Sequence, residues 1–521
     1  MHKCVKGYFC SQNIHIFLIG LLYYMSTVEN GEMEMDKKDI HEIVGRQRSF
    51  FDKGGTKNIG TRIFYLHKIK EYILKNEAKI AAALKADLGK SAYESYLCEI
   101  AVVIAEANYM LSNIKKLTKS KTVLTPFGQQ LSHSYIRPAP YGVVLIMSPW
   151  NYPFMLTLPP IIDAVAAGNT CVVKTSAYSP NTSKLVKEML EIIFPKEYVA
   201  VVDGGRAENQ SLLDEKFDYI FFTGSKAVGK VVLQKAAQNI TPVTLELGGK
   251  SPTIVDETAN LKISARRLVF GKGFNVGQTC VAPDYVYVHE SVKDAFVALV
   301  KEEIERQFGD CLHNEDYGCI INEKHYNRIM GLIDPAKVVH GGQGNPENRK
   351  IQMTVLDNVT WDDAVMKEEI FGPIIPILTY TDLRDVVDVI KGYDKPLALY
   401  IFSKNKENIE FVHSSCSFGG GCVNETDIHV ITTSMGFGGV GESGMGQYHG
   451  KNGFDTFTHY TSIVDKMTWI DLGQRYQPYN KMNIWLSRNL NFGSVTHKIL
   501  QTDYKALPSA FNELIGFYFG K

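Results

Sequence analysis

Residues 277–281 (GQTCV) and 245–250 (LELGGK) each place one reactive side chain beside glycine, Cys280 in the first and Glu246 in the second. A thiol is a strong nucleophile near neutral pH, but its ordinary pKa of about 8.5 keeps it mostly protonated, so it needs local activation. A carboxylate deprotonates water more readily when burial raises its pKa above about 4.3, and the mostly apolar residues 243–245 favour such burial. The pair predicts a covalent catalyst, Cys280, with a separate base, Glu246. A glutamate that only caps the turn at Gly248 is the alternative.

Four segments together closely resemble the aldehyde dehydrogenase superfamily, namely the two above with residues 148–153 (SPWNYP) and 368–373 (EEIFGP). The resemblance extends from about residue 40 to about residue 480. It implies that Cys280 adds to an aldehyde, that the thiohemiacetal expels hydride toward a nicotinamide, and that Glu246 activates the water that hydrolyses the thioester. It also implies that the Asn151 side chain hydrogen-bonds the oxyanion. From the residues alone, Asn151 is better explained as part of the turn before Pro153.

Residues 224–230 (GSKAVGK) match the beginning of a phosphate-binding loop, but Val231 stands where a Ser or Thr would bind magnesium. Nucleoside triphosphate chemistry is therefore disfavoured. Free amides and the positive end of a helix that begins near Ser225 can still hold a pyrophosphate without a metal. The alternative is a plain helix cap. The resemblance implies an NAD or NADP site, which it assigns to Lys174 at the adenosine ribose, Gly224, Ser225 and Gly229 at the pyrophosphate, Glu369 and Phe371 at the nicotinamide end, and Trp150 beside them.

The choice between NAD and NADP is expected to depend on residues 174–177 (KTSA). Many relatives have a glutamate at the last of these positions, where it accepts hydrogen bonds from the ribose hydroxyls and repels a 2′-phosphate. Ala177 removes both effects, while Lys174 remains to pair with a phosphate. We therefore predict that NADP is used alongside NAD.

Residues 436–441 and His449 are not assigned to cofactor binding. Residues 436–441 (GFGGVG) match a dinucleotide-binding fingerprint, but no clear strand precedes them and no acidic partner follows at a suitable distance. They resemble instead the active-site loop that the family places after Asn424; a flexible turn is the alternative. His449 follows that loop, and a hydrogen-bonded structural histidine is the preferred interpretation.

The elements that must position these residues follow from periodicity. Residues 37–117 are helical in pattern, and residues 123–140 form an extended excursion marked by proline and glycine. Short apolar strands then alternate with helices, which predicts a parallel sheet covered on both faces. The predicted strands are 143–147, 171–174, 198–202, 217–223 and 243–247, with helices at 156–167, 180–194, 208–216 and 225–239; a second series follows with strands at 285–289, 374–379 and 398–402.

The fold class is therefore predicted as α/β, with a Rossmann-like cofactor domain, an αβ catalytic domain and a small β element. Residues 454–464 alternate with period two, and by resemblance they pair with the excursion to form an oligomerisation element. The predicted boundaries are 1–36 for an N-terminal extension, 37–122 and 141–246 for the NAD(P)-binding domain, 247–423 for the catalytic domain, 424–449 for the active-site loop region, 123–140 and 450–466 for the oligomerisation element, and 481–521 for a C-terminal extension.

Composition limits the partners. Lys plus Arg and Asp plus Glu are 56 each, which gives no basic footprint for nucleic acid. The nine cysteines contain no C-x-x-C pair, so no metal site is predicted and a cytoplasmic, reducing location is expected. Residues 14–25 are apolar but short for a membrane span. A weak signal anchor, a loose extension and a start codon assigned too early are the readings considered, and the last is preferred.

Residues 441–451 (GESGMGQYHGK) and 475–479 (RYQPY), with Asp284 and Tyr285, are similar to class 3 aldehyde dehydrogenases. This branch implies medium-chain to long-chain aliphatic or aromatic aldehydes and a homodimer. Residues 507–521 carry an apolar helical face that could cover the substrate mouth or a subunit seam, or contact lipid. The rival functions are a CoA-acylating or phosphorylating dehydrogenase, which typically lacks the water-activating glutamate, and a catalytically silent structural protein.

Overall fold

The computed structural model describes residues 37–126, 129, 131–469, 471, 476–479, 481 and 483. The predictions for residues 1–36 and for nearly all of 481–521 therefore lie outside the described residues. The chain divides into two compact units, one formed by the chain up to Ile114 together with Pro140–Phe457, and the other by Lys115–Ala139 and the chain from Thr458 onward. Residues of both the predicted cofactor domain and the predicted catalytic domain lie in the first unit.

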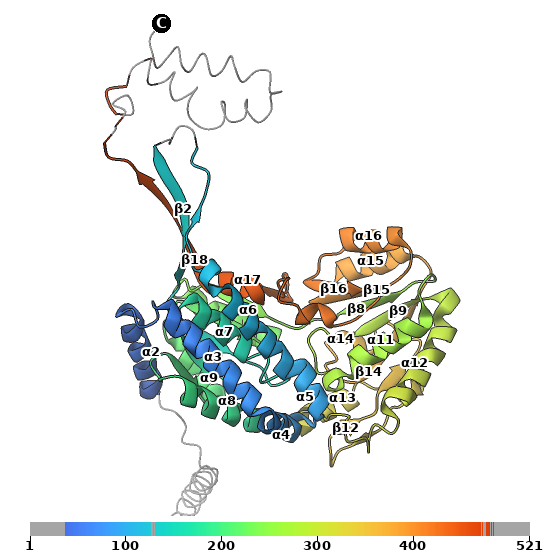
Figure 1. The fold of residues 1–521 in the computed structure, drawn as a ribbon. Coiled ribbons are helices and arrows are strands. Elements are labelled where there is room, and N and C mark those ends of the chain that lie inside the picture. Colours follow the sequence, from blue (N-terminus) through green and yellow to red (C-terminus); the bar gives the residue numbers. More distant parts are fainter. Residues whose placement is uncertain are drawn as a thin grey trace, which may run out of the picture. The chain divides into compact units, whose positions relative to one another are not determined.

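The first sheet of this unit has six strands in the order β17-β7-β6-β3-β4-β5, and the helices α8 (Pro180–Ile193) and α9 (Arg206–Asp214) that pack beside it are labelled in Figure 1. All neighbours are parallel except β17, which pairs antiparallel with β7. Chain order reverses between β3 and β6, and open α/β sheets bind ligands at the carboxyl ends of strands around such a point. The strands are β3 (Val143–Met147), β4 (Thr170–Lys174), β5 (Val199–Val202), β6 (Tyr219–Thr223), β7 (Val243–Glu246) and β17 (Gly444–Met445).

Helices cover both faces of this sheet. Alternate residues of β3 divide between the faces, since Val143, Leu145 and Met147 belong to a core shared with α2, α9 and α10. Helices α7 and α8 contact β3, β4 and β5. The bounds are α2 (Lys37–Asp52), α7 (Leu158–Ala167), α8 (Pro180–Ile193), α9 (Arg206–Asp214) and α10 (Lys226–Ala237). The predicted alternation of strands and helices is thus confirmed. Pro180 begins α8 as expected, but the Ser179 side chain makes no capping hydrogen bond.

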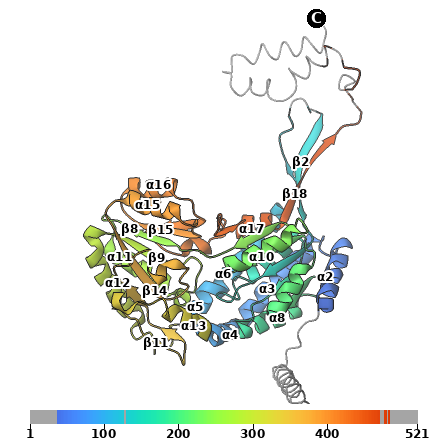
Figure 2. The same ribbon diagram turned by 180° about the vertical axis from the view of Figure 1, so that it is seen from behind.

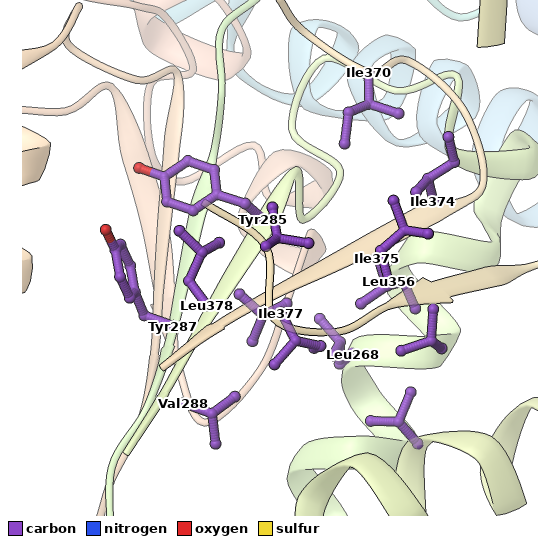
Figure 3. Close-up of a cluster of buried hydrophobic side chains, with 14 of the residues drawn as sticks. Leu268, Tyr285, Tyr287, Val288, Leu356, Ile370, Ile374, Ile375, Ile377 and Leu378 are labelled. Carbon is purple, nitrogen blue, oxygen red and sulfur yellow. The ribbon is translucent and has the colours of Figure 1, made fainter. Parts of the chain in front are cut away.

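The second sheet has seven strands in the order β10-β13-β14-β9-β8-β15-β16, parallel except for β10. Figure 2 labels four of its strands, β14, β9, β8 and β15. Figure 3 shows part of the apolar core around it, in which Leu268 of α11 lies near Val288 and Ile377 of neighbouring strands. The main elements are β8 (Pro252–Val255), α11 (Leu261–Gly273), β9 (Tyr285–His289), α12 (Lys293–Phe308), α13 (Glu323–Met330), β10 (Val338–His340), β13 (Thr354–Leu356), α14 (Ala364–Lys367), β14 (Ile374–Tyr380), α15 (Leu383–Gly392), β15 (Ala398–Phe402), α16 (Lys406–Ser415) and β16 (Gly420–Val423).

A helical layer precedes the sheets in sequence. It comprises α3 (Ile59–Lys75), α4 (Glu77–Leu88), α5 (Ala92–Ser95), a π-helical turn at Tyr96–Ile100 and α6 (Ala101–Leu117). The continuous helical run Ala92–Leu117 is long and apolar enough to cross a membrane by length and composition alone, and 44% of its most apolar window is buried inside the fold. Core helices of soluble proteins pass the same test, so this run is weak evidence for a membrane span.

The second unit contains a three-stranded sheet in the order β1-β2-β18, formed by Lys121–Thr122, Ser132–Pro140 and Thr458–Lys466. The predicted pairing of the excursion with the late alternating segment is therefore confirmed. The start of that segment is corrected, because Gly450–Thr456 forms helix α17, which packs against α7 in the first unit. Phe454 lies on α17 and Phe457 is its C-cap residue, and both are buried core residues, so these two apolar residues belong to a helix end rather than to a strand.

Candidate active site

A pocket of about 680 Å³ opens where the two sheets of the first unit approach each other. The first sheet contributes segments that follow the carboxyl ends of β3, β6 and β7. The second contributes segments that precede β9, β14 and β15. Parallel strands end at a common edge, which explains why residues far apart in sequence meet here. Of the predicted site residues the pocket wall contains Cys280, Glu246, Asn151, Trp150, Gly224, Ser225, Glu369 and Phe371, but not Lys174 or Gly229.

The segment before Cys280 adopts a conformation that side chains rarely adopt. Asn275 and Val276 have φ values of 47° and 54°, and a left-handed conformation is unusual for a β-branched residue. Hydrogen bonds from other elements hold it in place. The Asn275 amide N–H donates to Glu94 at 2.5 Å, and the Asn275 side chain donates to the Asn151 carbonyl at 2.7 Å. Backbone strain of about 1–3 kcal/mol per residue is thus maintained in the segment that leads to the proposed nucleophile.

Cys280 is partly exposed to the pocket, whereas its surroundings are buried. Burial raises the pKa of its thiol, and the nearby carboxyls of Glu369 and Glu246 raise that pKa further. The thiol is therefore neutral in the described state. A thiolate at this position requires a positive charge in the pocket or removal of the proton by a base.

Glu246 ends β7 with its side chain buried, and neither carboxylate oxygen has a hydrogen-bond partner. Burial raises the pKa of this carboxyl well above its ordinary value. A glutamate that capped the Gly248 turn would accept a hydrogen bond from that turn, and no such bond is present. The geometry therefore favours a carboxyl that is held ready for a reactant over a turn cap.

Asn151 follows β3 and is buried at the pocket wall. Its side-chain nitrogen donates to the Gln278 carbonyl at 3.0 Å, two residues before Cys280. A primary amide carries two N–H donors, so one remains for another acceptor. The structure thus ties the predicted oxyanion donor directly to the segment that carries the nucleophile.

A buried ion pair that the sequence analysis missed supports this arrangement. Lys90 and Glu99 are fully buried, and the Lys90 ammonium donates to Glu99 at 2.5 Å and to the Asn151 carbonyl at 3.0 Å. The second Glu99 oxygen accepts from the backbone N–H groups of Phe154 and Met155. Glu99 lies in the π-helical turn, a feature often found at functional sites. The signal in the sequence that could have revealed this ion pair was an acidic residue, Glu99, between the apolar residues Cys98 and Ile100.

Three of the residues predicted to bind the cofactor, Gly224, Ser225 and Gly229, lie at the beginning of α10. Ser225 caps this helix, since its hydroxyl accepts from the Val228 N–H at 3.5 Å. Ser225, Lys226 and Ala227 line the pocket, which places the helix N-terminus at its wall. Gly229 lies one turn further on, where an added Cβ would be 2.7 Å from a Leu247 methyl. Gly229 therefore permits close packing of helix on strand and does not contact the pocket.

Glu369 and Phe371 lie on the opposite wall. Glu369 is half-buried with its carboxylate packed against Gly248, its buried Oε1 has no hydrogen-bond partner, and desolvation together with Asp284 raises its pKa to about 8. An unpartnered buried oxygen suits an acceptor for sugar hydroxyls. The Phe371 ring lies edge-on to Trp150 with centroids 5.4 Å apart, which forms an aromatic wall.

Lys174 ends β4 as predicted. Its ammonium donates to the carbonyls of Thr175 and Gly204, both at 2.6 Å, and the side chain is largely buried. One of its three donors remains available. Glu208 and Asp203 are the acidic groups near it.

The loop after Asn424 forms part of the pocket wall through Phe437, Glu442 and Tyr448, as expected of an active-site loop. His449 is buried, and its Nδ1 lies 2.9 Å from Glu106, so a hydrogen-bonded structural histidine is confirmed. The Tyr448 ring stacks on His449 with centroids 4.0 Å apart. The loop is thus attached to the helical layer directly behind the pocket.

The donor set in the pocket fits a nicotinamide dinucleotide. A helix N-terminus, the unpartnered Glu369 oxygen and an aromatic wall suit a pyrophosphate, a ribose and a planar ring respectively. Among the described residues, no group of three or more His, Cys, Asp or Glu side chains could hold a metal ion. The seven cysteines that the structure describes are all free.

Comparisons with known proteins agree with this geometry. The model of the aldehyde dehydrogenase family matches residues 28–463. The chain is 46% identical over 435 residues to the 4,4′-diaponeurosporen-aldehyde dehydrogenase of Staphylococcus aureus, covering 83% of this chain and 95% of that protein. It is 41% identical over 443 residues to the dimeric NADP-preferring aldehyde dehydrogenase of Canis lupus familiaris, covering 84% and 98%. It is 40% identical over 417 residues to aldehyde dehydrogenase family 3 member A2 of Rattus norvegicus, covering 80% and 86%.

A solved structure described as the substrate-bound state of Staphylococcus aureus AldH superposes with a TM-score of 0.86 at 43% identity. It covers 88% of this chain and 100% of the other. The family model, the relatives matched over most of their length and the solved structure all agree. The chain therefore belongs to the aldehyde dehydrogenase family.

Proposed function

We propose that Cys280, Glu246 and Asn151 carry out the reaction of this chain as nucleophile, base and oxyanion donor. The reaction follows from the family: an aldehyde is oxidised to the carboxylic acid, and NAD or NADP accepts the hydride. The observation that carries the proposal is the buried, unpartnered Glu246 carboxyl in the same pocket as Cys280 and Asn151.

Each residue has a defined step. The Cys280 thiol gives up its proton to water as its sulfur forms a bond to the aldehyde carbon. The carbonyl oxygen becomes an oxyanion, and the free N–H of Asn151 hydrogen-bonds it. Such a donor is typically worth about 2.7–4 kcal/mol of barrier. The bound dinucleotide supplies a hydride acceptor whose ring carries positive charge. Loss of hydride leaves a thioester on Cys280, and Glu246 takes a proton from the water that attacks it, which releases the acid and the thiol.

A thioester is open to other nucleophiles, so the identity of the acceptor depends on the pocket. CoA-acylating and phosphorylating relatives typically lack the glutamate that activates water. Retention of Glu246 at the pocket wall favours hydrolysis over acyl transfer, and its raised pKa suits a base that works near neutral pH.

The preference between NAD and NADP is proposed to depend on Ala177 and Lys174. Ala177 is exposed two residues after Thr175, and it offers neither acceptor nor negative charge. One Lys174 donor remains for a phosphate, although Glu208 and Asp203 oppose a phosphate there. We favour use of NADP alongside NAD, and the NADP-preferring dog relative is consistent with this preference.

Substrate class, assembly and location are also proposals. Relatives named for an apocarotenoid aldehyde and as family 3 members support medium-chain to long-chain or aromatic aldehydes. The name of the dog relative supports a homodimer. The free cysteines suit a reducing cytoplasm. A role of the C-terminal tail at the substrate mouth, a subunit seam or a lipid surface lies outside the described residues, and truncation after Tyr479 tests it through long-chain kinetics, sedimentation and vesicle binding.

Rapid mixing with aldehyde and cofactor tests the division of labour. Glu246→Gln should release one equivalent of reduced cofactor in a burst and then stall, because the thioester forms but is not hydrolysed. Cys280→Ala should show no burst, because no thiohemiacetal forms. Equal burst amplitudes in the two variants would overturn the assignment.

A further inference from the structure

The Cys280 segment has another point of attachment, after Cys280 in sequence, whereas Asn151 bonds the segment before it. The hydroxyl of Tyr400, a fully buried residue of β15, lies 2.6 Å from the Val281 carbonyl oxygen. The same hydroxyl lies 3.0 Å from Oδ1 of Asp427, which belongs to the loop after β16. Val281 directly follows the nucleophile, so this contact fixes the chain next to Cys280.

The number of protons available for these two hydrogen bonds decides whether the Asp427 carboxyl is ionised or neutral. A tyrosine hydroxyl has a single proton to donate, yet both neighbours of Tyr400 are acceptors when Asp427 is ionised. One of them then lacks a donor. If the carboxyl carries a proton, Asp427 donates to the Tyr400 oxygen, and Tyr400 donates to the Val281 carbonyl. Only this arrangement satisfies both contacts, and leaving a buried polar group without a partner is costly.

The surroundings of Asp427 suit a neutral carboxyl. Its side chain is buried, and its Oδ2 has no hydrogen-bond partner. The carboxyl packs against Gly271 of α11, where an added Cβ would be 2.3 Å from Oδ2. Burial raises the pKa of Asp427 to about 7, against the lowering effects of Tyr400 and Lys272. Titratable groups around it are Lys272 on α11, Tyr400 on β15, Cys98 on the π-helical turn, Tyr152 after β3, Cys422 on β16, Cys280, and Glu425 on its own loop.

We infer that Asp427 is a positioning residue for Cys280, which in its protonated form holds the nucleophile segment through Tyr400 and the Val281 carbonyl. The inference rests on the proposed role of Cys280 as nucleophile. Ionisation of Asp427 has two effects. It leaves Tyr400 with two competing acceptors, and it adds a negative charge to those that already raise the pKa of the Cys280 thiol.

Three variants separate these effects. Asp427→Asn removes the charge but retains a donor toward Tyr400. Asp427→Ala removes both. Tyr400→Phe removes the contact with Val281 and leaves the carboxyl in place. Glu425→Gln is the matched control, since it changes the same charge two residues away at a side chain that pairs with Arg267.

The deciding measurement is the rate of the cofactor-reduction burst at pH 6. Wild type and Asp427→Asn should be similar, whereas Asp427→Ala and Tyr400→Phe should be slower by about tenfold or more, because small displacements of a nucleophile are costly. Glu425→Gln should stay near wild type. Equal burst rates in Asp427→Asn and Asp427→Ala overturn the inference. If Asp427→Ala fails to fold, Tyr400→Phe decides in its place, and a wild-type burst rate overturns the inference.

Alkylation of Cys280 by iodoacetamide, followed by mass spectrometry of its peptide, provides a readout that does not depend on aldehyde oxidation. At pH 8 Asp427→Asn should react about threefold to tenfold faster than wild type, which corresponds to a fall of about half to one unit in the thiol pKa. At pH 5.5 the two should match, and identical profiles at both pH values overturn the charge effect. A burst that persists in Cys280→Ala would instead refute the proposed function.

Discussion

Buried acids occupy two neighbouring regions, and they differ in how fully they are hydrogen-bonded. In the helical layer, Glu99 accepts from Lys90 and from two backbone N–H groups, and Glu106 accepts from the Gly450 N–H and lies beside His449. In the pocket wall, Glu246 has no partner on either oxygen, and Glu369 has none on Oε1. The unpartnered oxygens of the second set are buried, as Glu99 and Glu106 are, so burial alone does not distinguish the two sets.

The difference separates acids whose oxygens are hydrogen-bonded within the fold from acids whose oxygens are open to a ligand. A buried carboxylate with all its acceptors used stabilises the groups around it, whereas one without partners carries a desolvation cost that only a reactant or cofactor offsets. Asp163 in the helical region is the exception. Both of its oxygens lack partners, and burial together with the adjacent Glu106 raises its pKa well above the ordinary value, so it is held neutral.

The largest expected effect is on turnover. Glu246→Gln should lower steady-state aldehyde oxidation by about 10²–10⁴-fold, the usual contribution of a general base. Because the substitution removes an uncompensated buried carboxylate, the free energy of unfolding should not fall. Parallel turnover and urea-unfolding measurements check both halves. A variant that loses activity and unfolds more easily would place Glu246 among the structural acids.

The matched change in the helical layer should act on stability. Glu99→Gln leaves the Lys90 ammonium buried without its counter-ion, so the free energy of unfolding should fall by about 3–5 kcal/mol. Turnover should also fall, because the Asn151 carbonyl and the amides of Phe154 and Met155 lose their anchor. Urea unfolding measures the first effect. A stability equal to that of Glu246→Gln would erase the distinction between the two regions.

The pH dependence of activity and stability should also distinguish the acids of the pocket wall from those of the helical layer. Hydrolysis requires ionised Glu246, so the rate of thioester breakdown should rise with pH through the raised pKa of this carboxyl, and Glu246→Gln should lose that rise. The folded state also binds more protons than the unfolded state between the ordinary and the raised pKa, so this group lowers stability as pH increases there. The melting temperature of Glu246→Gln relative to wild type should therefore increase between pH 5 and pH 8. A constant difference would argue against a raised pKa.

The smallest effect concerns the rim of the cofactor site. Ala177→Glu adds an acceptor for ribose hydroxyls and a charge that opposes a 2′-phosphate, so the ratio of kcat/KM for NAD to that for NADP should rise by about tenfold, or about 1.4 kcal/mol. Steady-state kinetics with both cofactors measures it, and Ala177→Gln is the control that adds an acceptor without charge. Strict NAD use by wild type with no shift in Ala177→Glu would show that this position does not set the preference.

Local patterns predicted most of the architecture because they report local physics. Continuous apolar runs predicted strands that are buried on both faces, and Pro180 predicted the start of a helix. The pattern failed at residues 454–457, where Phe454 on the short helix α17 and Phe457 at its C-cap were taken for part of a strand. The domain boundaries and the roles of the site residues stay predictions, and the two compact units do not separate the predicted cofactor domain from the catalytic domain.

The sequence by itself determined the reactive groups, since Cys280, Glu246 and Asn151 stand in segments whose residue types and order are typical of one family. Only the tertiary structure decided what surrounds them. Three features depend on elements that are distant in sequence. They are the left-handed conformation of Asn275 and Val276, the contact of the Lys90–Glu99 pair with Asn151, and the contacts of Tyr400 with Asp427 and Val281. Hydrogen-bond partners and desolvation arise from packing across these elements, and therefore no spacing along the chain could have predicted them.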